Sequence, residues 1–250
     1  MSEPVVARGG TNLALRGELR CGWELARLAA DPQFLRPRRR TNAPPVLLVP
    51  GFMAGDQSLA VLRGWLRRRG STTASAGMWL NIDCAERAVR AIEIRLRRLA
   101  EQFDKRVAII GQSRGGELAR AVAVRNPGTV ETLVMLGSPV LDPLSVGPAV
   151  LRAVRSVARL GDLGISGLFS TKCADGPCCA AFREDLMAPI PEEVRTLAVY
   201  SRSDGIVSWR ACLDPWAEHV EVASSHIGMS CNREVFGAIS EILDENEEER

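Results

Sequence analysis

One serine of the chain lies in a sequence that favours nucleophilic chemistry. Ser113 is the middle residue of Gly111-Gln-Ser-Arg-Gly115, between the apolar run 107–110 and a helix-like stretch, 117–125. A serine in a sharp strand-to-helix turn takes a strained backbone conformation, and the residues two places away approach so closely that glycine fits best. The turn holds the hydroxyl clear of the backbone, and the next helix directs its N-terminal N–H groups toward it. The sequence therefore predicts a nucleophile elbow.

A serine hydroxyl is a weak nucleophile at neutral pH and needs a neighbouring base, and the chain has two histidines. His219 comes just before a predicted short strand, 220–223, and has the character of an exposed connection. His226 follows the carboxyl end of that strand, as Ser113 follows the end of its own strand. We therefore expect His226 to be the base.

An acidic partner for the histidine is expected after another strand. Asp204 lies just past the predicted strand 196–200, in the region where open α/β sheets assemble their sites. An aspartate before a glycine is commonly a turn former. Its place after the elbow and before His226 favours a catalytic role, in which the carboxylate orients the imidazole.

The order Ser113, Asp204, His226 is the order of the α/β-hydrolase superfamily. Over roughly residues 45–243 the chain resembles that superfamily, and in particular its bacterial esterases and lipases. The resemblance implies hydrolysis through an acyl-enzyme on a Ser-His-Asp triad, with no metal and no organic cofactor. A thioesterase or an acyltransferase would use the same machinery. A hydrolase-fold scaffold that binds a ligand or partner without catalysis is the alternative from another class.

The resemblance also implies an oxyanion hole made of backbone N–H groups. The first donor would be Phe52, or Met53 if the loop is shifted, and the second would be Arg114. Family members usually have His-Gly at the end of the preceding strand, where this chain has Pro50-Gly51. The change leaves the N–H donors in place.

Strands and helices must alternate to position these groups, and from Val46 onward they do. This alternation predicts an α/β fold with a doubly wound, mainly parallel sheet. The expected strands are 46–49, 75–82, 107–110, 130–136, 196–200 and 220–223, and the expected helices are 58–69, 84–103, 117–125 and 235–243. The N-terminal part is minimal, with one helix over 11–30 whose apolar face would contain Leu15, Leu19, Gly22, Ala26 and Ala29.

The alternation of strands and helices stops between 141 and 191, a stretch without a clear core strand. An insertion with its own structure is expected there. It contains an amphipathic helix over 150–160. In the resembling family an insertion here caps the active site, although a plain surface helix pair fits the pattern too. The predicted division is therefore an N-terminal helix and linker (1–45), a core (46–140 and 192–243), a cap (141–191) and an acidic tail (244–250).

The expected substrate is a small ester with an apolar acyl chain. Apolar side chains should line its pocket, and the candidates are Phe52, Met53, Phe169 and Met229.

Composition disfavours several other functions, although a basic strip that contacts phosphate and a loose association with a membrane surface stay open. The 250 residues are 46% apolar and 25% charged, with a net charge of +2, so no overall field favours nucleic acid. Arginines cluster at 36–40 and 67–69, but these clusters lack the interleaved aromatic residues of a nucleic-acid site. No signal peptide and no membrane-spanning stretch is visible, so we expect a cytoplasmic protein.

The chain contains seven cysteines. Cys173, Cys178 and Cys179 lie close together in sequence, whereas Cys21, Cys84, Cys212 and Cys231 are scattered. Reduced structural thiols, a local disulfide and a zinc site are all open for the clustered three. The spacing matches no C-x-x-C pair, which disfavours zinc.

Overall fold

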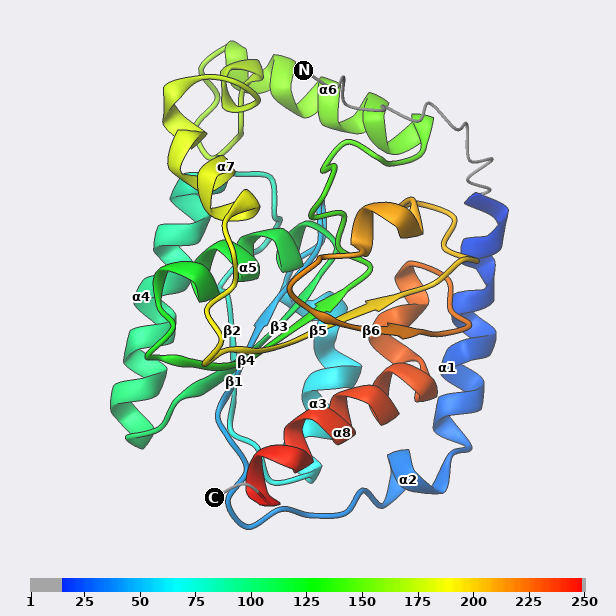
Figure 1. Cartoon of the computed structure of the whole chain (residues 1–250). Coiled ribbons are helices and arrows are strands. Elements are labelled where there is room, and N and C mark those ends of the chain that lie inside the picture. Colours follow the sequence, from blue (N-terminus) through cyan, green and yellow to red (C-terminus); the bar gives the residue numbers. More distant parts are fainter. Residues whose placement is uncertain (1–14, 249–250) are drawn as a thin grey trace, which may run out of the picture.

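The computed structural model describes residues 15–248, and a six-stranded parallel sheet forms its centre (Figure 1). The strand order is β2-β1-β3-β4-β5-β6, and every neighbouring pair is parallel. The strands are β1 (Val46–Val49), β2 (Thr73–Ser75), β3 (Val107–Gln112), β4 (Val130–Leu136), β5 (Arg195–Tyr200) and β6 (Glu218–Glu221). The order reverses between β1 and β3, which confirms the predicted doubly wound α/β sheet.

Helices cover both faces of this sheet (Figure 1). One layer consists of α4 (Ala85–Phe103), α5 (Arg114–Arg125) and α7 (Ala180–Met187), and the other of α1 (Cys21–Ala29), α3 (Ala60–Arg68) and α8 (Arg233–Glu248). The remaining α-helices are α2 (Pro32–Leu35) and α6 (Pro148–Asp162). Short 3-10 helices are η1 (Leu15–Arg20), η2 (Asp56–Leu59), η3 (Thr171–Cys173), η4 (Pro177–Cys179), η5 (Trp209–Cys212) and η6 (Ile227–Cys231).

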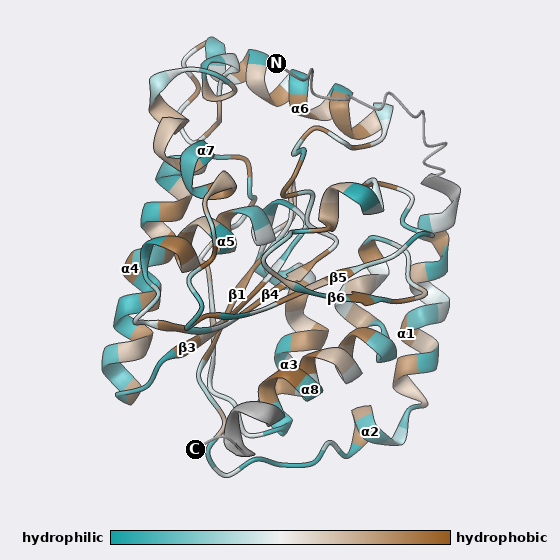
Figure 2. Cartoon of the chain, in the orientation of Figure 1, coloured by the Kyte–Doolittle hydropathy of each residue, from teal (hydrophilic) through white to brown (hydrophobic). Residues whose placement is uncertain are grey.

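Apolar runs explain the central strands, because a strand covered on both faces buries every side chain. All residues of β3 and β4 are buried. In β1, Leu47 and Val49 pack toward α4 and α5, while Val46 and Leu48 pack toward α3 and α8. Figure 2 shows the same apolar character along the strands. Two cores thus form, one on each side of the sheet.

The second strand differs from the prediction. A strand over 75–82 is wrong, since β2 ends at Ser75. The Asp56 carboxylate accepts hydrogen bonds from the N–H groups of Gly77 and Met78, and Gly77 has a positive φ of 75°. These contacts turn the chain out of the sheet. A single bridge between Asn81 and Phe52 is what remains of strand character beyond the turn.

The N-terminal segment also differs. Residues 11–14 of the predicted helix lie outside the described residues, and a 3-10 turn precedes α1. The predicted apolar face is wrong: Leu19 is 84% exposed, whereas Glu18 and Glu24 are buried beside Leu28. The glutamates are buried because their carboxylates accept hydrogen bonds from backbone N–H groups of the loop that contains Ser225 and His226.

The segment 141–191 carries α6 and α7, and α6 lies beyond the end of the sheet (Figure 1). A fully buried guanidinium joins this segment to the core. Arg120 on α5 pairs with Asp214 at 2.5 Å and donates to the backbone oxygens of Asp185 (2.7 Å) and Ala188 (2.9 Å). Its charge is therefore paired, and each of its three nitrogens has a partner within the protein.

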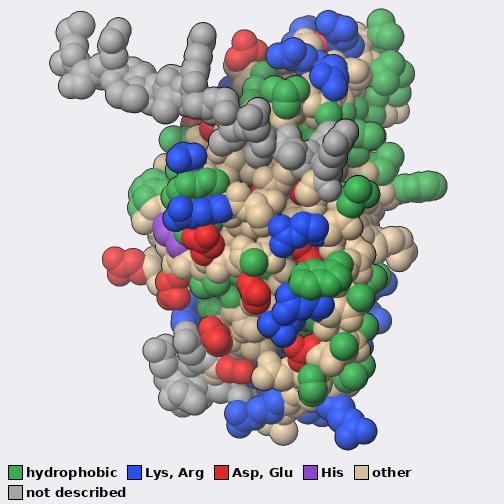
Figure 3. Space-filling model, turned by 90° about the vertical axis from the view of Figure 1, so that its right-hand side faces the viewer, with side chains coloured by type: hydrophobic (Ala, Val, Ile, Leu, Met, Phe, Trp, Pro, Cys, Tyr) green, Lys and Arg blue, Asp and Glu red, His purple; other side chains and the backbone are tan. Residues whose placement is uncertain are grey.

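The arginine clusters have structural partners. Arg40 and Arg69 are buried and both form ion pairs with Asp244. On the face seen in Figure 3, basic and acidic side chains are interspersed. Across residues 15–248, none of the helices combines the length and apolar character that a bilayer span requires.

Candidate active site

Ser113 occupies a strained turn between β3 and α5. Its backbone lies at φ 53° and ψ −126°, outside the regions that ordinary residues prefer. A Cβ on Gly111 would lie 2.4 Å from the oxygen of Gly115, and a Cβ on Gly115 would lie 2.3 Å from the oxygen of Val49. The glycines at both positions are therefore required by close backbone approach, and the turn has the predicted elbow geometry.

Asp204 and His226 form a buried pair at the carboxyl ends of β5 and β6. The Nδ1 atom of His226 lies 2.6 Å from Oδ2 of Asp204. The other carboxylate oxygen accepts hydrogen bonds from the N–H groups of Ile206 (2.8 Å) and Val207 (2.7 Å). Both oxygens of Asp204 are thus held, and Nε2 of the imidazole is left for other partners.

Electrostatics raise the pKa of His226. Burial of the imidazole alone would lower it, but the Asp204 carboxylate opposes this by its charge and by its hydrogen bond. The charge of Glu18 adds to the effect. The net result is a pKa above the ordinary value of 6.5, so the pair holds a proton on the imidazole more tightly than free histidine does.

The serine and histidine segments meet at one cavity. The side-chain amide of Gln112, the residue before Ser113, donates to the backbone oxygen of His226 at 2.9 Å. Ser113 and His226 both line a cavity of about 970 Å³. The chain thus places Ser113 and His226 on the wall of one cavity, and Asp204 lies behind His226 in contact with its imidazole.

The cavity is mainly apolar and is large enough for a drug-sized ligand. Phe52 from the β1 loop and Phe169 from the 141–191 segment line it, with ring centroids 6.1 Å apart. Helix α6 adds Leu151, Val154 and Ala158. An apolar group would be desolvated here.

Two of the proposed pocket residues lie elsewhere. Met229 lies in η6, where it is fully buried and packs in the core beside α8. Met53 is 52% exposed on the loop after β1. Among the described residues, neither belongs to the cavity lining, so this part of the prediction is wrong.

Solved structures share this arrangement of sheet and helices. The mature lipase BlEst2 of Bacillus licheniformis superposes with a TM-score of 0.61 at 15% identity, covering 85% of this chain and 96% of that chain. The 2-hydroxy-6-oxo-6-phenylhexa-2,4-dienoate hydrolase of Rhodococcus sp. strain RHA1 gives 0.57 at 15% identity, covering 83% and 92%. The carboxylesterase CesB of Bacillus subtilis gives 0.51 at 12% identity, covering 91% and 97%.

The chain has the α/β-hydrolase fold. In sequence, no protein-family model matches it, and no curated protein matches it either. Among these comparisons, the likeness is therefore found in structure.

In this hydrolase fold, the loop after β1 lies directly against the elbow. A Cβ on Gly51 would lie 3.3 Å from Cβ of Ser113. The N–H of Met53 already donates to the oxygen of Asn81 at 3.4 Å, which favours Phe52 as the donor that faces the cavity. Arg114 is the first residue of α5, where backbone N–H groups lack helical partners.

Asn81 fixes this loop, and sequence reasoning missed it. Its side-chain amide donates to the oxygen of Pro50 at 2.8 Å. The Arg114 guanidinium donates to both the backbone and side-chain oxygens of Asn81, each at 3.0 Å. The loop after β1 and the start of α5 are thereby held in one network.

Two further missed residues come from the N-terminal segment of the hydrolase fold. Glu18 accepts hydrogen bonds from the N–H groups of Gly205 (3.0 Å), His226 (3.0 Å) and Ile227 (2.8 Å). Glu24 accepts from the N–H of Ser225 at 2.8 Å and from its hydroxyl at 3.0 Å. The two carboxylates therefore bind the loops that carry Asp204 and His226. No local pattern signals such long-range contacts.

Proposed function

We propose that the protein is a serine hydrolase that cleaves carboxylic esters with an apolar acyl chain. The main support for this proposal is that His226, paired with Asp204, and the strained turn at Ser113 line one mainly apolar cavity. The solved lipases, esterases and hydrolases of the same fold support the class of reaction.

Each residue has a defined task in this proposal. His226 takes the proton of the Ser113 hydroxyl through Nε2 as the oxygen attacks the ester carbonyl. Asp204 holds the imidazole tautomer and stabilises its protonated form. The backbone N–H groups of Phe52 and Arg114 bind the oxyanion, and loss of one such donor costs about 100- to 1000-fold in rate.

Three further proton transfers complete the reaction. His226 gives its proton to the departing alkoxide, which leaves the acyl group on Ser113. Water, deprotonated by the same imidazole, attacks this acyl-enzyme, and His226 then returns the proton to the Ser113 oxygen as the acid leaves. The segment 141–191 caps the site in this proposal and supplies apolar contacts to the acyl chain through α6 and Phe169.

A chain-length series of p-nitrophenyl esters tests the proposal. Wild-type protein should hydrolyse them, and an alkyl fluorophosphonate should add covalently to Ser113, as located by peptide mass spectrometry. Ser113→Ala should lose both activity and labelling. Ser156→Ala, an exposed hydroxyl on α6, is the matched control and should retain both. Equal turnover by wild type and Ser113→Ala would overturn the proposal and favour a non-catalytic binding protein.

A further inference from the structure

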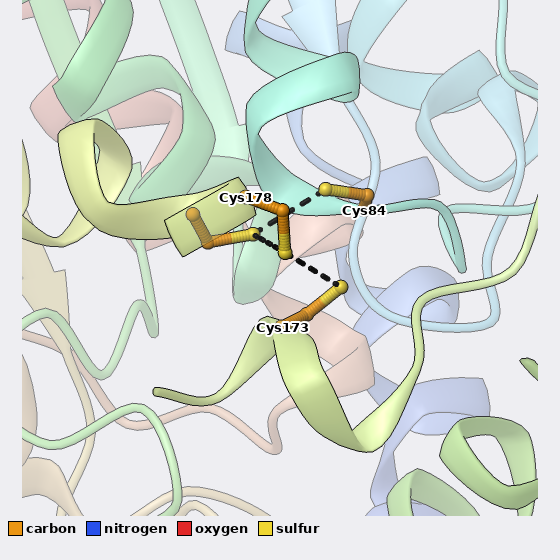
Figure 4. A group of neighbouring side chains, drawn as sticks. Cys84, Cys173 and Cys178 are labelled. Atoms are coloured by element: carbon orange, nitrogen blue, oxygen red, sulfur yellow. Dashed lines mark hydrogen bonds between the residues drawn. The ribbon is translucent and has the colours of Figure 1, made fainter. Parts of the chain in front are cut away.

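Four cysteine sulfurs converge where the segment 141–191 meets the start of α4. They belong to Cys84, Cys173, Cys178 and Cys179, and all four Sγ atoms lie within 4.8 Å of one another. Figure 4 shows Cys84, Cys173 and Cys178 pointing toward one another from different segments. We propose that this cluster binds one Zn²⁺ ion through four thiolates.

The distances between the sulfur atoms fit a tetrahedral ion. A Zn–S bond of about 2.3 Å in tetrahedral geometry places the sulfurs about 3.8 Å apart. The contacts that link the set are 3.3 Å for Cys84–Cys179, 3.9 Å for Cys178–Cys179 and 3.8 Å for Cys173–Cys178. A disulfide needs one pair at about 2.05 Å and gives no reason for four sulfurs to gather. Mutual closeness of all four favours a shared ion.

The four cysteines are presented by the N-terminus of α4 and by the two short helices η3 and η4. Cys84 is the N-cap residue of the 19-residue helix α4, whose N-terminus favours anionic ligands. Cys173 ends η3 and Cys178 lies in η4, and Gly176 makes the turn between them. A Cβ on Gly176 would lie 2.3 Å from the oxygen of Lys172, so the turn tolerates no side chain.

Polar groups outside the sulfurs also suit a thiolate site. The N–H of Ser170 donates to Sγ of Cys173 at 3.4 Å, the kind of contact that orients a metal ligand. Arg183 donates to the backbone oxygens of Cys173 (3.5 Å) and Gly176 (3.0 Å). Its single positive charge offsets half of the net charge of −2 that a Zn²⁺ ion with four thiolates would have.

The site would tie the 141–191 segment to the core. Cys84 belongs to the sheet-covering layer, whereas the other three ligands belong to the inserted segment. Cys173 also lines the cavity, so the ion would fix one part of its wall. Binding releases up to four protons, one from each thiol, and adds its free energy to folding. The four-cysteine site was not predicted from the sequence, because Cys84 and Cys179 are 95 residues apart.

Metal analysis of the full-length protein, purified without chelator and with Zn²⁺ in the medium, tests the proposal. We expect about one zinc per chain. Replacing zinc by Co²⁺ should give the visible bands of a tetrahedral ion and strong thiolate-to-cobalt charge transfer. Cys178→Ser, at an exposed position, and Cys84→Ser should each lose the zinc and weaken the charge-transfer band. Cys212→Ser changes a buried cysteine outside the cluster and should keep both.

Several results would overturn the assignment. They are a metal-free protein that takes up neither Zn²⁺ nor Co²⁺, one equivalent of iron in place of zinc, or disulfides among these cysteines in the mass spectrum of alkylated protein. Circular dichroism of Cys178→Ser separates metal loss from unfolding. A folded Cys178→Ser protein that retains full zinc and an unchanged cobalt spectrum would also contradict the proposal.

Discussion

The carboxylate of Glu18 accepts a hydrogen bond from the backbone N–H of His226 at 3.0 Å, across 208 residues of sequence. The same oxygen accepts from Gly205, beside Asp204. One buried side chain therefore sets the spacing between the loop of the proposed acid and the loop of the proposed base. We regard Glu18 as a positioning residue, since it touches neither the cavity nor the hydroxyl of Ser113 among the described contacts.

Glu18→Gln should lower kcat/KM by roughly 10- to 100-fold, mainly through kcat, because small misplacement of a catalytic group is costly. The substitution also removes one of the charges that raise the pKa of His226, so the acid limb of the pH–rate profile should move to lower pH. Steady-state kinetics across pH measure both effects. Glu101→Gln, at an exposed position on α4, is the control. If the acid limb of the Glu18→Gln profile has the same midpoint as that of the wild type, Glu18 does not raise the pKa of His226.

The wild-type pH profile should reflect a histidine of raised pKa. The base must be neutral to accept a proton, and neighbouring carboxylates favour its charged form. Activity should therefore rise with pH through a midpoint above 6.5, the ordinary histidine value. Asp204→Asn should lower that midpoint and reduce kcat by about 10³- to 10⁴-fold. A wild-type midpoint below 6.5 in kcat/KM would contradict this account.

Glu117 predicts a pH effect on stability. Its side chain is 6% exposed, and burial raises its pKa to about 8, against the opposing charge of Arg114. The folded state then keeps a proton that the unfolded state loses near pH 4.5, so stability falls as pH rises from about 4.5 to about 8. Glu117→Gln stays neutral, and its melting temperature relative to wild type should increase over that range. Parallel curves for the two proteins would show that Glu117 is ionised in the fold.

Val154 on α6 offers a test of the cavity. Val154→Trp should fill part of the cavity in which the acyl chain would lie. Because a long acyl chain then no longer fits, kcat/KM for p-nitrophenyl decanoate should fall by roughly 10-fold or more. The acetate ester should be affected much less. Ser156→Trp introduces the same side chain on the exposed face of α6 and serves as control. Equal losses on both esters would indicate general damage instead of a chain-length effect.

Local patterns in the sequence predicted the framework well. The apolar runs at 46–49 and 130–136 coincide with β1 and β4, because strands covered on both faces need uninterrupted apolar residues. The edge strand β6 (Glu218–Glu221) begins two residues before the predicted 220–223, since its partly exposed residues form no such run. Strand ends, together with the glycine-flanked motif and the choice between two histidines, led to the prediction of Ser113 and His226 as site residues.

Long-range contacts set the limit of that approach. Glu18, Asn81 and Cys84 act on groups far away in sequence, and nothing next to them distinguishes them from ordinary surface or core residues. A buried glutamate contradicts the usual preference for apolar residues on a buried face, which explains the wrong face predicted for the N-terminal helix.

Arg120 bears on how the segment 141–191 could be exchanged. Its guanidinium donates to two backbone carbonyl groups at the end of α7, so foreign sequence in place of 141–191 would leave these two buried donors without partners, and Asp214 would be the partner that remains. Chimeras that exchange the whole segment should therefore be less stable unless position 120 is changed with it. For the proposed hydrolase activity, selectivity is better redesigned through single side chains of α6.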